Sequence, residues 1–401
     1  MTSSLEGIVC ADRRKRATLA VMEGDDVLRT LLAARVPGAF AELRPYVPDA
    51  TSVAVRLDAN EAPPWLPTLN EAERALHRDA LLSVEPARYP DVRATQLRAA
   101  VAARDLVEPS QLVFGVGSDE LIALLLATLS STISGRAPSI VVPSPSFVMY
   151  RVSARVHGYD VVEVPLLPSC DLDEGAMLEA IARVRPSVIF LATPNNPTSR
   201  AYDRDKVERL VAAAAHNDPP SIVVVDEAYL PFRLGALDPW SGVTGLDLLS
   251  RHSNVVVMRT LSKIGLAALR VGWVVAHPLL VAELEKARLP YNLPAHSQSL
   301  AACALGPLAG SIDRHVRSIV AERARLITEL ARVSGVEHAR ADANFVWLRC
   351  PRPGAMIAAS LKEHGVLVRS FPAFPDRIRV TVGAPHDDDR FLTALHAALR
   401  V

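Results

Sequence analysis

The sequence lacks net charge, long apolar runs and closely spaced cysteines, and each absence excludes a class of protein. Lysine and arginine together number 44, and aspartate and glutamate also number 44. Nucleic-acid-binding proteins need a cationic surface, so this balance argues against a nucleic-acid partner. No apolar run approaches the roughly 18 residues that a membrane-spanning helix needs, so we expect no membrane partner either.

Cysteine and histidine spacing argues against disulfides and metal sites. The four cysteines include no CxxC pair, which favours reduced thiols in a cytoplasmic protein; they are Cys10, Cys170, Cys303 and Cys350. The eleven histidines contain no HExxH motif, and the acidic run 387–389 is more typical of a helix start than of a metal site. The basic patch 13–16 precedes an apolar stretch too short for a secretion signal. We therefore predict no metal and a cytoplasmic location.

Half of the 401 residues are hydrophobic, and short runs rich in valine and isoleucine recur in the middle of the chain. Such runs, separated by helical stretches such as Arg204–His216, are typical of buried strands in a largely parallel sheet. The runs are Ser139–Val142, Val188–Ala192, Ser221–Val225, Asn254–Met258 and Val271–Ala276. We predict an α/β fold with a large domain, whose mostly parallel sheet is flanked by helices, and a smaller α+β domain.

The expected organisation has four parts. Residues 1–36 form an N-terminal extension with one short helix, Asp25 to Arg35, that ends before Pro37 and Gly38. Residues 37–84 form an N-terminal arm and part of the small domain. Residues 85–287 form the large domain, and residues 288–401 form the small C-terminal domain. Apolar residues recur at helical spacing in Glu283–Arg288 and Ile312–Val333, so we expect helices there. The expected strands of the small domain are Ala343–Leu348, Val366–Ser370 and Ile378–Val382.

Polar residues follow the predicted strands, at the sheet edge where open α/β folds bind ligands. Asp226 ends a run of three valines, where a carboxylate either caps a helix or faces a cationic group of a ligand. Lys263 follows another strand; it is either a surface lysine or a partly buried amine that reacts with a carbonyl group. The segment Gly115–Glu120 opens a helix, which fits a bound phosphate or an ordinary helix start.

Taken together, these motifs resemble the fold-type-I pyridoxal 5′-phosphate (PLP) aminotransferases and, within them, the histidinol-phosphate aminotransferase family. The resemblance runs from about Leu43 to Val401. Eight stretches match in order and spacing: Leu57–Glu61, Arg88–Asp91, Gly117–Glu120, Pro194–Thr198, Val225–Tyr229, Arg259–Lys263, Leu269–Gly272 and Arg379–Gly383. One such match means little, but their joint order is specific.

The resemblance implies PLP as the cofactor, held in residues 85–287. It makes Lys263 the residue that binds PLP covalently and moves the substrate proton, and Asp226 the partner of the pyridinium nitrogen. It places Asn196 and Tyr229 on the 3′-oxygen of the ring and Phe147 on the ring face. It assigns the phosphate of PLP to Ser118, Asp119, Thr260, Ser262 and Arg270.

The resemblance also implies a homodimer with shared active sites, in which Tyr89 reaches the cofactor phosphate of the neighbouring subunit. Arg379 is the expected clamp for the anionic group of the substrate, since a guanidinium binds carboxylates and phosphates bidentately. Arg369 and Tyr46 stand where the family places further phosphate contacts. An exposed strand-end arginine and a packing tyrosine are the alternative interpretations of these two residues.

The sequence departs from the family pattern at several positions. Phe147 stands where many relatives have tyrosine, and Ser199 replaces the usual glycine. The stretch from Lys263 to Arg270 is one residue shorter than in most relatives. The loop 60–88 is long, and the segment 369–379 is unusually apolar.

The leading functional hypothesis is transamination between L-histidinol phosphate and 2-oxoglutarate in histidine biosynthesis. The apolar segment Phe371–Phe374 motivates a second hypothesis, an aminotransferase for aromatic or other amino acids. A third is a PLP-dependent decarboxylase or lyase. A transcription regulator carrying this domain is a fourth, but residues 1–36 show no helix-turn-helix pattern. In the first two cases the partners are a small amino donor and a 2-oxo acid.

Overall fold

The computed structural model describes residues 25–38, 40, 43–45, 47, 49–133, 135–233 and 244–400. The chain divides into two units, Met1–Pro48 and Asp49–Val401. In the first unit, residues 25–35 are helical, which confirms the helix predicted there. In the described ranges no helix combines the length and the apolar character needed to cross a bilayer. Cys170, Cys303 and Cys350 carry free thiols, whereas Cys10 lies outside the described residues.

The second unit contains a seven-stranded sheet with the order β2-β8-β7-β6-β5-β3-β4. Strands β3 to β7 run parallel, while β8 is antiparallel to both of its neighbours, so the sheet is mostly parallel as predicted. The bounds are β2 (Leu112–Val116), β3 (Ser139–Ser144), β4 (Asp160–Pro165), β5 (Val188–Ala192), β6 (Ile222–Asp226), β7 (Val255–Thr260) and β8 (Val271–Ala276). Strands β2 and β4 were not predicted from the sequence.

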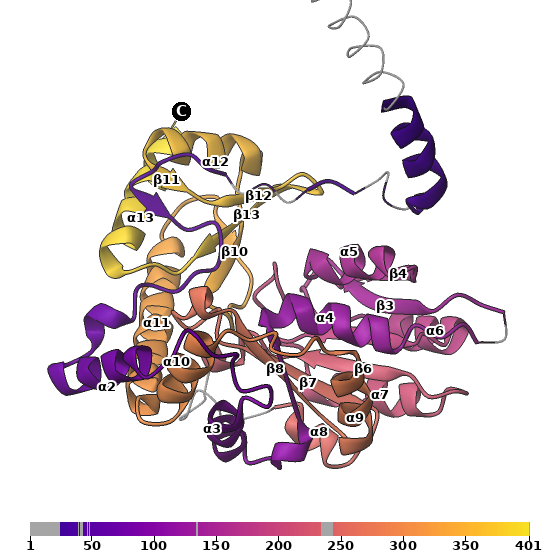
Figure 1. The fold of residues 1–401 in the computed structure, drawn as a ribbon. Helices are drawn as coiled ribbons and strands as arrows, with labels where there is room; N and C mark the ends of the chain where they lie inside the picture. Colours follow the sequence, from indigo (N-terminus) through magenta and orange to yellow (C-terminus); the bar gives the residue numbers. More distant parts are fainter. Residues whose placement is uncertain are drawn as a thin grey trace, which may run out of the picture. The chain divides into compact units, whose positions relative to one another are not determined.

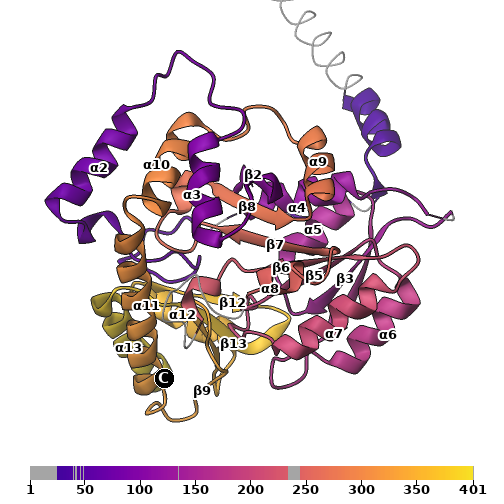
Figure 2. The ribbon, with the colours of Figure 1, turned by 90° about the horizontal axis from the view of Figure 1, so that it is seen from below.

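Successive residues of the central strands pack on opposite faces of the sheet, and both faces are buried. In β5, Val188 and Phe190 belong to one apolar cluster, whereas Ile189 and Leu191 belong to the other. Burying each such side chain contributes about 1.5–3 kcal/mol, which is why the strands are continuous apolar runs. Figure 2 shows α4 (Gly117–Thr128), α5 (Val148–Val156) and α9 (Pro278–Ala287) on one side of the strands. Helices α6 (Glu174–Val184) and α7 (Arg204–Ala215) lie on the other side.

A second group of elements surrounds a four-stranded antiparallel sheet with the order β12-β13-β10-β9 (Figure 1). The strands of this sheet are β9 (Glu337–His338), β10 (Phe345–Arg349), β12 (Arg369–Phe371) and β13 (Phe374–Thr381). The helices of the group are α12 (Gly354–Glu363) and α13 (Pro385–Arg400). The first turn of α13 contains Asp387 and Asp388, as the acidic run predicted. Strand β1 (Val55–Arg56) pairs with β11 (Val366–Leu367), which brings the segment before residue 60 beside this sheet. The remaining helices are α2 (Glu71–Leu82), α3 (Thr95–Asp105), α8 (Leu246–Leu249), α10 (Ala295–Leu305) and α11 (Ala309–Leu330).

Candidate active site

One pocket at the carboxyl ends of the parallel strands contains most of the predicted site residues. Ser118 and Asp119 come from the start of α4, and Asn196 follows β5. Lys263 follows β7. The complete lining is Ser118, Asp119, Phe147, Tyr150, Ala192, Asn196, Asp226, Ala228, Tyr229, Ser262, Lys263 and Arg270. Parallel strands end at the same edge, so side chains far apart in the sequence meet there.

Asp226 is held at the end of β6 by two hydrogen bonds. Its Oδ2 accepts from the hydroxyl of Tyr150 at 2.5 Å, and its Oδ1 accepts from the backbone N–H of Ala228 at 2.9 Å. Burial raises the pKa of Asp226 to about 6, while the bonds from Tyr150 and Ala228 and the charge of Lys263 act in the opposite direction. Asp226 therefore releases its proton less readily than an exposed aspartate does, and a cationic ligand group beside it would stabilise its charged form.

Tyr150 is a site residue that the sequence analysis missed. Its ring stacks on Phe190 at a centroid distance of 4.6 Å and meets Phe147 edge to face at 5.5 Å. Burial, followed by the charge of Asp226, raises the pKa of Tyr150 well above its ordinary value, so the hydroxyl remains a donor. The only local signal is a tyrosine three residues after Phe147, in the first turn of α5.

Ser118 at the start of α4, Ser262 in the loop after β7 and Arg270 just before β8 form a site suited to an anion, which we call the anion cradle. Arg270 approaches the Ser262 hydroxyl at 3.3 Å through Nη1 and Asp119 at 3.3 Å through Nη2. Gly117 has φ +74°, and a Cβ there would lie 2.6 Å from Nη2 of Arg270, so glycine is required for this approach. Free N–H groups at a helix start, a hydroxyl and a guanidinium together suit a phosphate group.

Thr260 lies behind this cradle and does not line the pocket. Its hydroxyl lies 2.9 Å from that of Ser262, donates to the carbonyl of Val271 at 3.1 Å and accepts from the Ser262 N–H at 3.1 Å. This geometry orients Ser262, and a direct contact of Thr260 with the phosphate stays a prediction.

Arg379 on β13 lies beside the pocket and is bonded to Asn196, one of the lining residues. Its Nη1 donates to Oδ1 of Asn196 at 2.7 Å, and its Nη2 donates to the carbonyl of Asp58 at 2.6 Å. Arg369 on β12 pairs directly with Arg379 across the sheet and is exposed. Directly opposed residues of an antiparallel pair share a face, so the two guanidinium groups lie on one side of the sheet.

The two predicted tyrosines outside the pocket have different outcomes. Tyr89 has 83% of its surface exposed and stacks on Tyr291 at a centroid distance of 4.8 Å. It does not line this chain's pocket, which is compatible with the prediction that it serves a neighbouring subunit. Tyr46 lies outside the described residues, so its predicted role stays a prediction.

Behind the pocket, a buried ionic network that the sequence analysis also missed fixes the ends of β6 and β7. Arg259 is 1% exposed and bonds Asp105 at 2.6 Å and Glu227 at 2.8 Å. Burial disfavours the charge of Arg259, but the two carboxylates outweigh burial and raise its pKa. Trp273 donates to the second oxygen of Asp105 at 2.8 Å. Breaking a buried pair of this kind costs about 3–5 kcal/mol, so the network is rigid.

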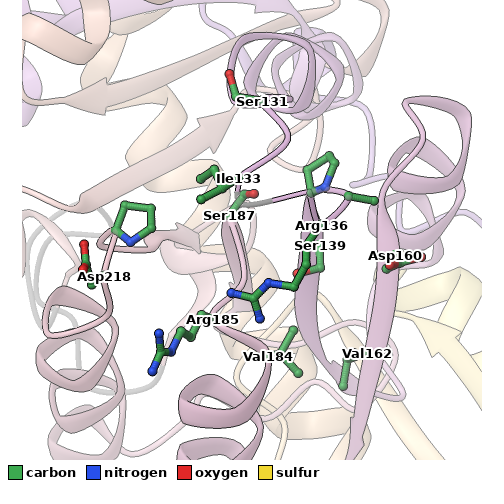
Figure 3. Close-up of a pocket in the computed structure, with 13 residues that line it drawn as sticks. Ser131, Ile133, Arg136, Ser139, Asp160, Val162, Val184, Arg185, Ser187 and Asp218 are labelled. Carbon is green, nitrogen blue, oxygen red and sulfur yellow. The ribbon is translucent and has the colours of Figure 1, made fainter.

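A second pocket lies at the opposite, amino-terminal ends of the strands (Figure 3). It is lined by residues next to the starts of β3 to β6, among them Arg136, Asp160, Arg185 and Asp218, and by none of the predicted site residues. Nor do the described residues contain a group of three histidine, cysteine or acidic side chains able to hold a metal ion. Most of the predicted site residues therefore lie at the carboxyl ends of the strands, and none lines the second pocket.

The fold and this site define a known class of enzyme. A sequence model of the aminotransferase class I and II family matches residues 54–397. The chain belongs to this family.

Two relatives and one solved structure are similar to this chain over most of its length. The histidinol-phosphate aminotransferase of Methylibium petroleiphilum is 38% identical over 350 residues, which cover 86% of this chain and 89% of the relative. Histidinol-phosphate aminotransferase 1 of Burkholderia lata is 38% identical over 358 residues, covering 88% and 94% of the two chains. The solved structure of histidinol-phosphate aminotransferase from Sinorhizobium meliloti in complex with PLP has a TM-score of 0.78 at 22% identity, covering 91% of this chain and 98% of that chain. This likeness confirms the predicted fold type.

Proposed function

We propose that the protein is a PLP-dependent aminotransferase that exchanges the amino group between L-histidinol phosphate and 2-oxoglutarate. One observation carries the proposal. The amine of Lys263, the carboxyl of Asp226 and the anion cradle line one pocket, in a chain 38% identical to histidinol-phosphate aminotransferases over most of both lengths. The products are the imidazole-acetol phosphate and glutamate.

The residues present fit PLP. The cradle of Ser118, Ser262 and Arg270 matches a phosphate, and glycine at 117 leaves the space that the Arg270 guanidinium needs. Asp226, with its pKa raised by burial, faces the pocket, and no arginine or lysine of the described residues is hydrogen-bonded to it, as suits a partner for a protonated ring nitrogen. Phe147 offers an aromatic face at the same pocket.

Each side chain then has a defined task. Bound PLP supplies an electron sink that stabilises negative charge at the amino-bearing carbon of the substrate. Lys263 would hold the cofactor through its amine, which lines the pocket, and would be the group that moves the proton at that carbon. Asp226 would keep a proton on the ring nitrogen, and Tyr229 and Asn196 would hydrogen-bond the 3′-oxygen of the ring.

The two half-reactions bring different anions to the same guanidinium. Arg379 can bind the α-carboxylate of glutamate bidentately, and the exposed Arg369 on the same sheet face adds charge for the phosphate ester of histidinol phosphate. Tyr46 would supply a further phosphate contact. We also propose a cytoplasmic homodimer, in which Tyr89 contacts the cofactor phosphate of the partner subunit; its 83% exposure leaves it available for that contact.

The test is the ultraviolet–visible spectrum of the purified protein before and after addition of L-histidinol phosphate without any keto acid. We expect loss of the band of the lysine-bound cofactor and growth of the pyridoxamine band. K263A should show neither the first band nor the change. A first band that ignores histidinol phosphate but responds to another amino donor would remove this substrate from the proposal.

An aromatic amino-acid aminotransferase is the second candidate, because the Phe371 ring lies 5.8 Å from the Arg379 guanidinium carbon. The rings of Phe371 and Phe374 pack on Trp347 at 5.0 and 6.0 Å, so this apolar segment has a packing role as well. Faster turnover of phenylalanine or tyrosine than of histidinol phosphate would favour the second candidate. Release of CO₂ without keto acid would favour a decarboxylase.

A further inference from the structure

Asn60 connects three segments of the chain beside the pocket. It is 1% exposed and has a left-handed backbone, with φ 56°. Its side-chain Nδ2 donates to the Tyr229 hydroxyl at 2.9 Å, and its backbone N–H donates to Oγ1 of Thr381 on β13 at 3.0 Å. Its carbonyl accepts from Nδ2 of Asn344 at 3.1 Å. A left-handed position favours glycine or asparagine, but only asparagine adds the bond to Tyr229.

The direction of the bond between Asn60 and Tyr229 follows from the neighbouring hydroxyl. Oγ1 of Thr381 accepts the backbone N–H of Asn60, so its own hydrogen is left to donate to Oδ1 of Asn60, 3.4 Å away. With the amide oxygen on that side, the amide nitrogen faces Tyr229. An amide N–H only donates, so the Tyr229 oxygen accepts, and its single hydrogen must point elsewhere.

We propose that Asn60 is a positioning residue that makes Tyr229 a hydrogen-bond donor toward the 3′-oxygen of bound PLP. The inference rests on the proposed function, because it needs PLP in the pocket that Tyr229 lines. A hydroxyl that accepts one hydrogen bond becomes a stronger donor in the next. Donation to the 3′-oxygen would stabilise negative charge on that oxygen. Bound PLP would therefore lose its proton at a lower pH when Asn60 is present.

The other groups around Tyr229 cannot replace Asn60 in this task. The Lys263 amine lies 5.8 Å from the ring centroid, and Arg379 already donates to Asn196 and to the backbone of residue 58. Asp226 accepts from Tyr150 and Ala228. Lys263 from the loop after β7 and Tyr150 from α5 are titratable groups near Tyr229, Asp226 at the end of β6 lines the same pocket, and Arg379 of β13 bonds the lining residue Asn196. Strand β10 contributes the uncharged ring of Phe345, 5.1 Å away and edge to face.

The experiment is a pH titration of the visible absorption band of the lysine-bound cofactor in purified holoenzyme. N60G keeps the left-handed backbone and removes only the amide, so the apparent pKa of the band should rise by roughly 0.5. N60D has the same shape but can only accept, so it should turn the Tyr229 hydrogen away from the pocket and give a larger rise. R185G is the matched control, because Arg185 is also left-handed (φ 49°) and lies beside the distant pocket of Figure 3; it should titrate as the wild type.

A double-variant comparison separates positioning from a general structural effect. In a Y229F background N60G should cause no further change of the apparent pKa, because Asn60 acts through the Tyr229 hydroxyl. Equal shifts with and without that hydroxyl, or an N60G titration identical to that of the wild type, would overturn the inference. A wild-type protein without any cofactor band would instead overturn the proposed function itself. N60D serves as the second variant if N60G fails to fold.

Discussion

The hydroxyl of Tyr150 lies 2.5 Å from Oδ2 of Asp226, and both side chains are buried on the same face of the central sheet. Stacking on Phe190 fixes the Tyr150 ring, so the hydrogen bond has little freedom to rotate away. The bond opposes the effect of burial and holds part of the negative charge on Asp226. A phenol on α5 thus regulates how strongly the carboxylate can hold a cation in the pocket.

Replacement of Tyr150 by phenylalanine should therefore shift activity toward higher pH. Y150F removes a donor to the carboxylate, so the pKa of Asp226 should rise further above about 6. A larger fraction of the carboxyl is then neutral at pH 6 than at pH 8. We expect kcat/KM to fall roughly tenfold at pH 6 and much less at pH 8. Measurement of kcat/KM across that range checks this, and an unchanged acidic limb would contradict it.

Arg379 should govern the binding of both substrates. R379K keeps the charge but loses the planar pair of donors, one of which already engages Asn196. We expect KM to rise by about tenfold or more for histidinol phosphate and for glutamate. Steady-state kinetics with each amino donor provides the measurement. A rise confined to one donor would show that Arg379 does not serve both anions.

Arg369 should discriminate between the two donors. It is exposed, lies opposite Arg379 and is expected to contact only the phosphate ester. R369A should raise KM for histidinol phosphate several-fold, by about 1 kcal/mol of binding free energy, and leave KM for glutamate unchanged. An equal rise in KM for both donors would mean that Arg369 makes a general electrostatic contribution. An unchanged KM for both would mean that Arg369 is a surface residue without a role in substrate binding.

Ser199 should stabilise the contact between the loop after β5 and β10. It has φ 63°, where relatives have glycine, and its hydroxyl donates to the carbonyl of Phe345 at 2.7 Å and accepts from the N–H of Ala343 at 3.1 Å. S199A loses both bonds and keeps the left-handed strain, so the free energy of unfolding should fall by about 1–3 kcal/mol. S199G loses the same bonds but relieves the strain and should be less destabilised. Urea unfolding of the three proteins tests this order.

Asp388 should make the folded protein less stable as the pH rises. Burial raises its pKa from the ordinary value of 3.8 to about 8, a hydrogen bond from the Gly383 N–H acts against this, and the neighbouring Glu322 adds to it. The folded chain thus keeps a proton that the unfolded chain releases near pH 4, so the free energy of unfolding falls between about pH 4 and pH 8.

The variant D388N removes this proton uptake. It should be more stable than the wild type by about 1–3 kcal/mol at pH 8. Near pH 4 the two proteins should be similar, since Asp388 is then protonated in the folded state. Denaturant unfolding at both pH values is the measurement. A difference that is the same at pH 4 and pH 8 would exclude the titration of Asp388 as its cause.

Most strands of the central sheet could be predicted from the local pattern of apolar residues in the sequence. The central strands are continuous apolar runs because both of their faces are buried, and this made β3 and β5 to β8 predictable. Strand β4 lies at the sheet edge, and its sequence, Asp160–Pro165, mixes exposed and buried residues. It therefore lacks the apolar run that marked the others. The left-handed Ser199 was visible only as a departure from a family pattern.

Pocket residues that belong to sequence motifs could be predicted, whereas contacts between residues far apart in the sequence could not. Asp226 ends β6 and Lys263 lies shortly after β7, and their sequence neighbours identify them. Contacts between distant segments of the chain leave no such signal. Tyr229 bonds Asn60 from 169 residues away, and Arg259 bonds Asp105 from 154 residues away. Such pairs depend on how the elements pack, and no periodicity in either segment records them.

Gly117 shows how one position can limit the evolution of the whole pocket. Its backbone conformation excludes most side chains, and the guanidinium of Arg270 occupies the space where a Cβ would stand. A neutral drift of the sequence could exchange many neighbours of the anion cradle one at a time. A side chain at position 117 would have to adopt a left-handed backbone and would also push the Arg270 guanidinium aside. Replacement of Gly117 therefore combines a backbone cost with a disturbance of the arginine that approaches Ser262.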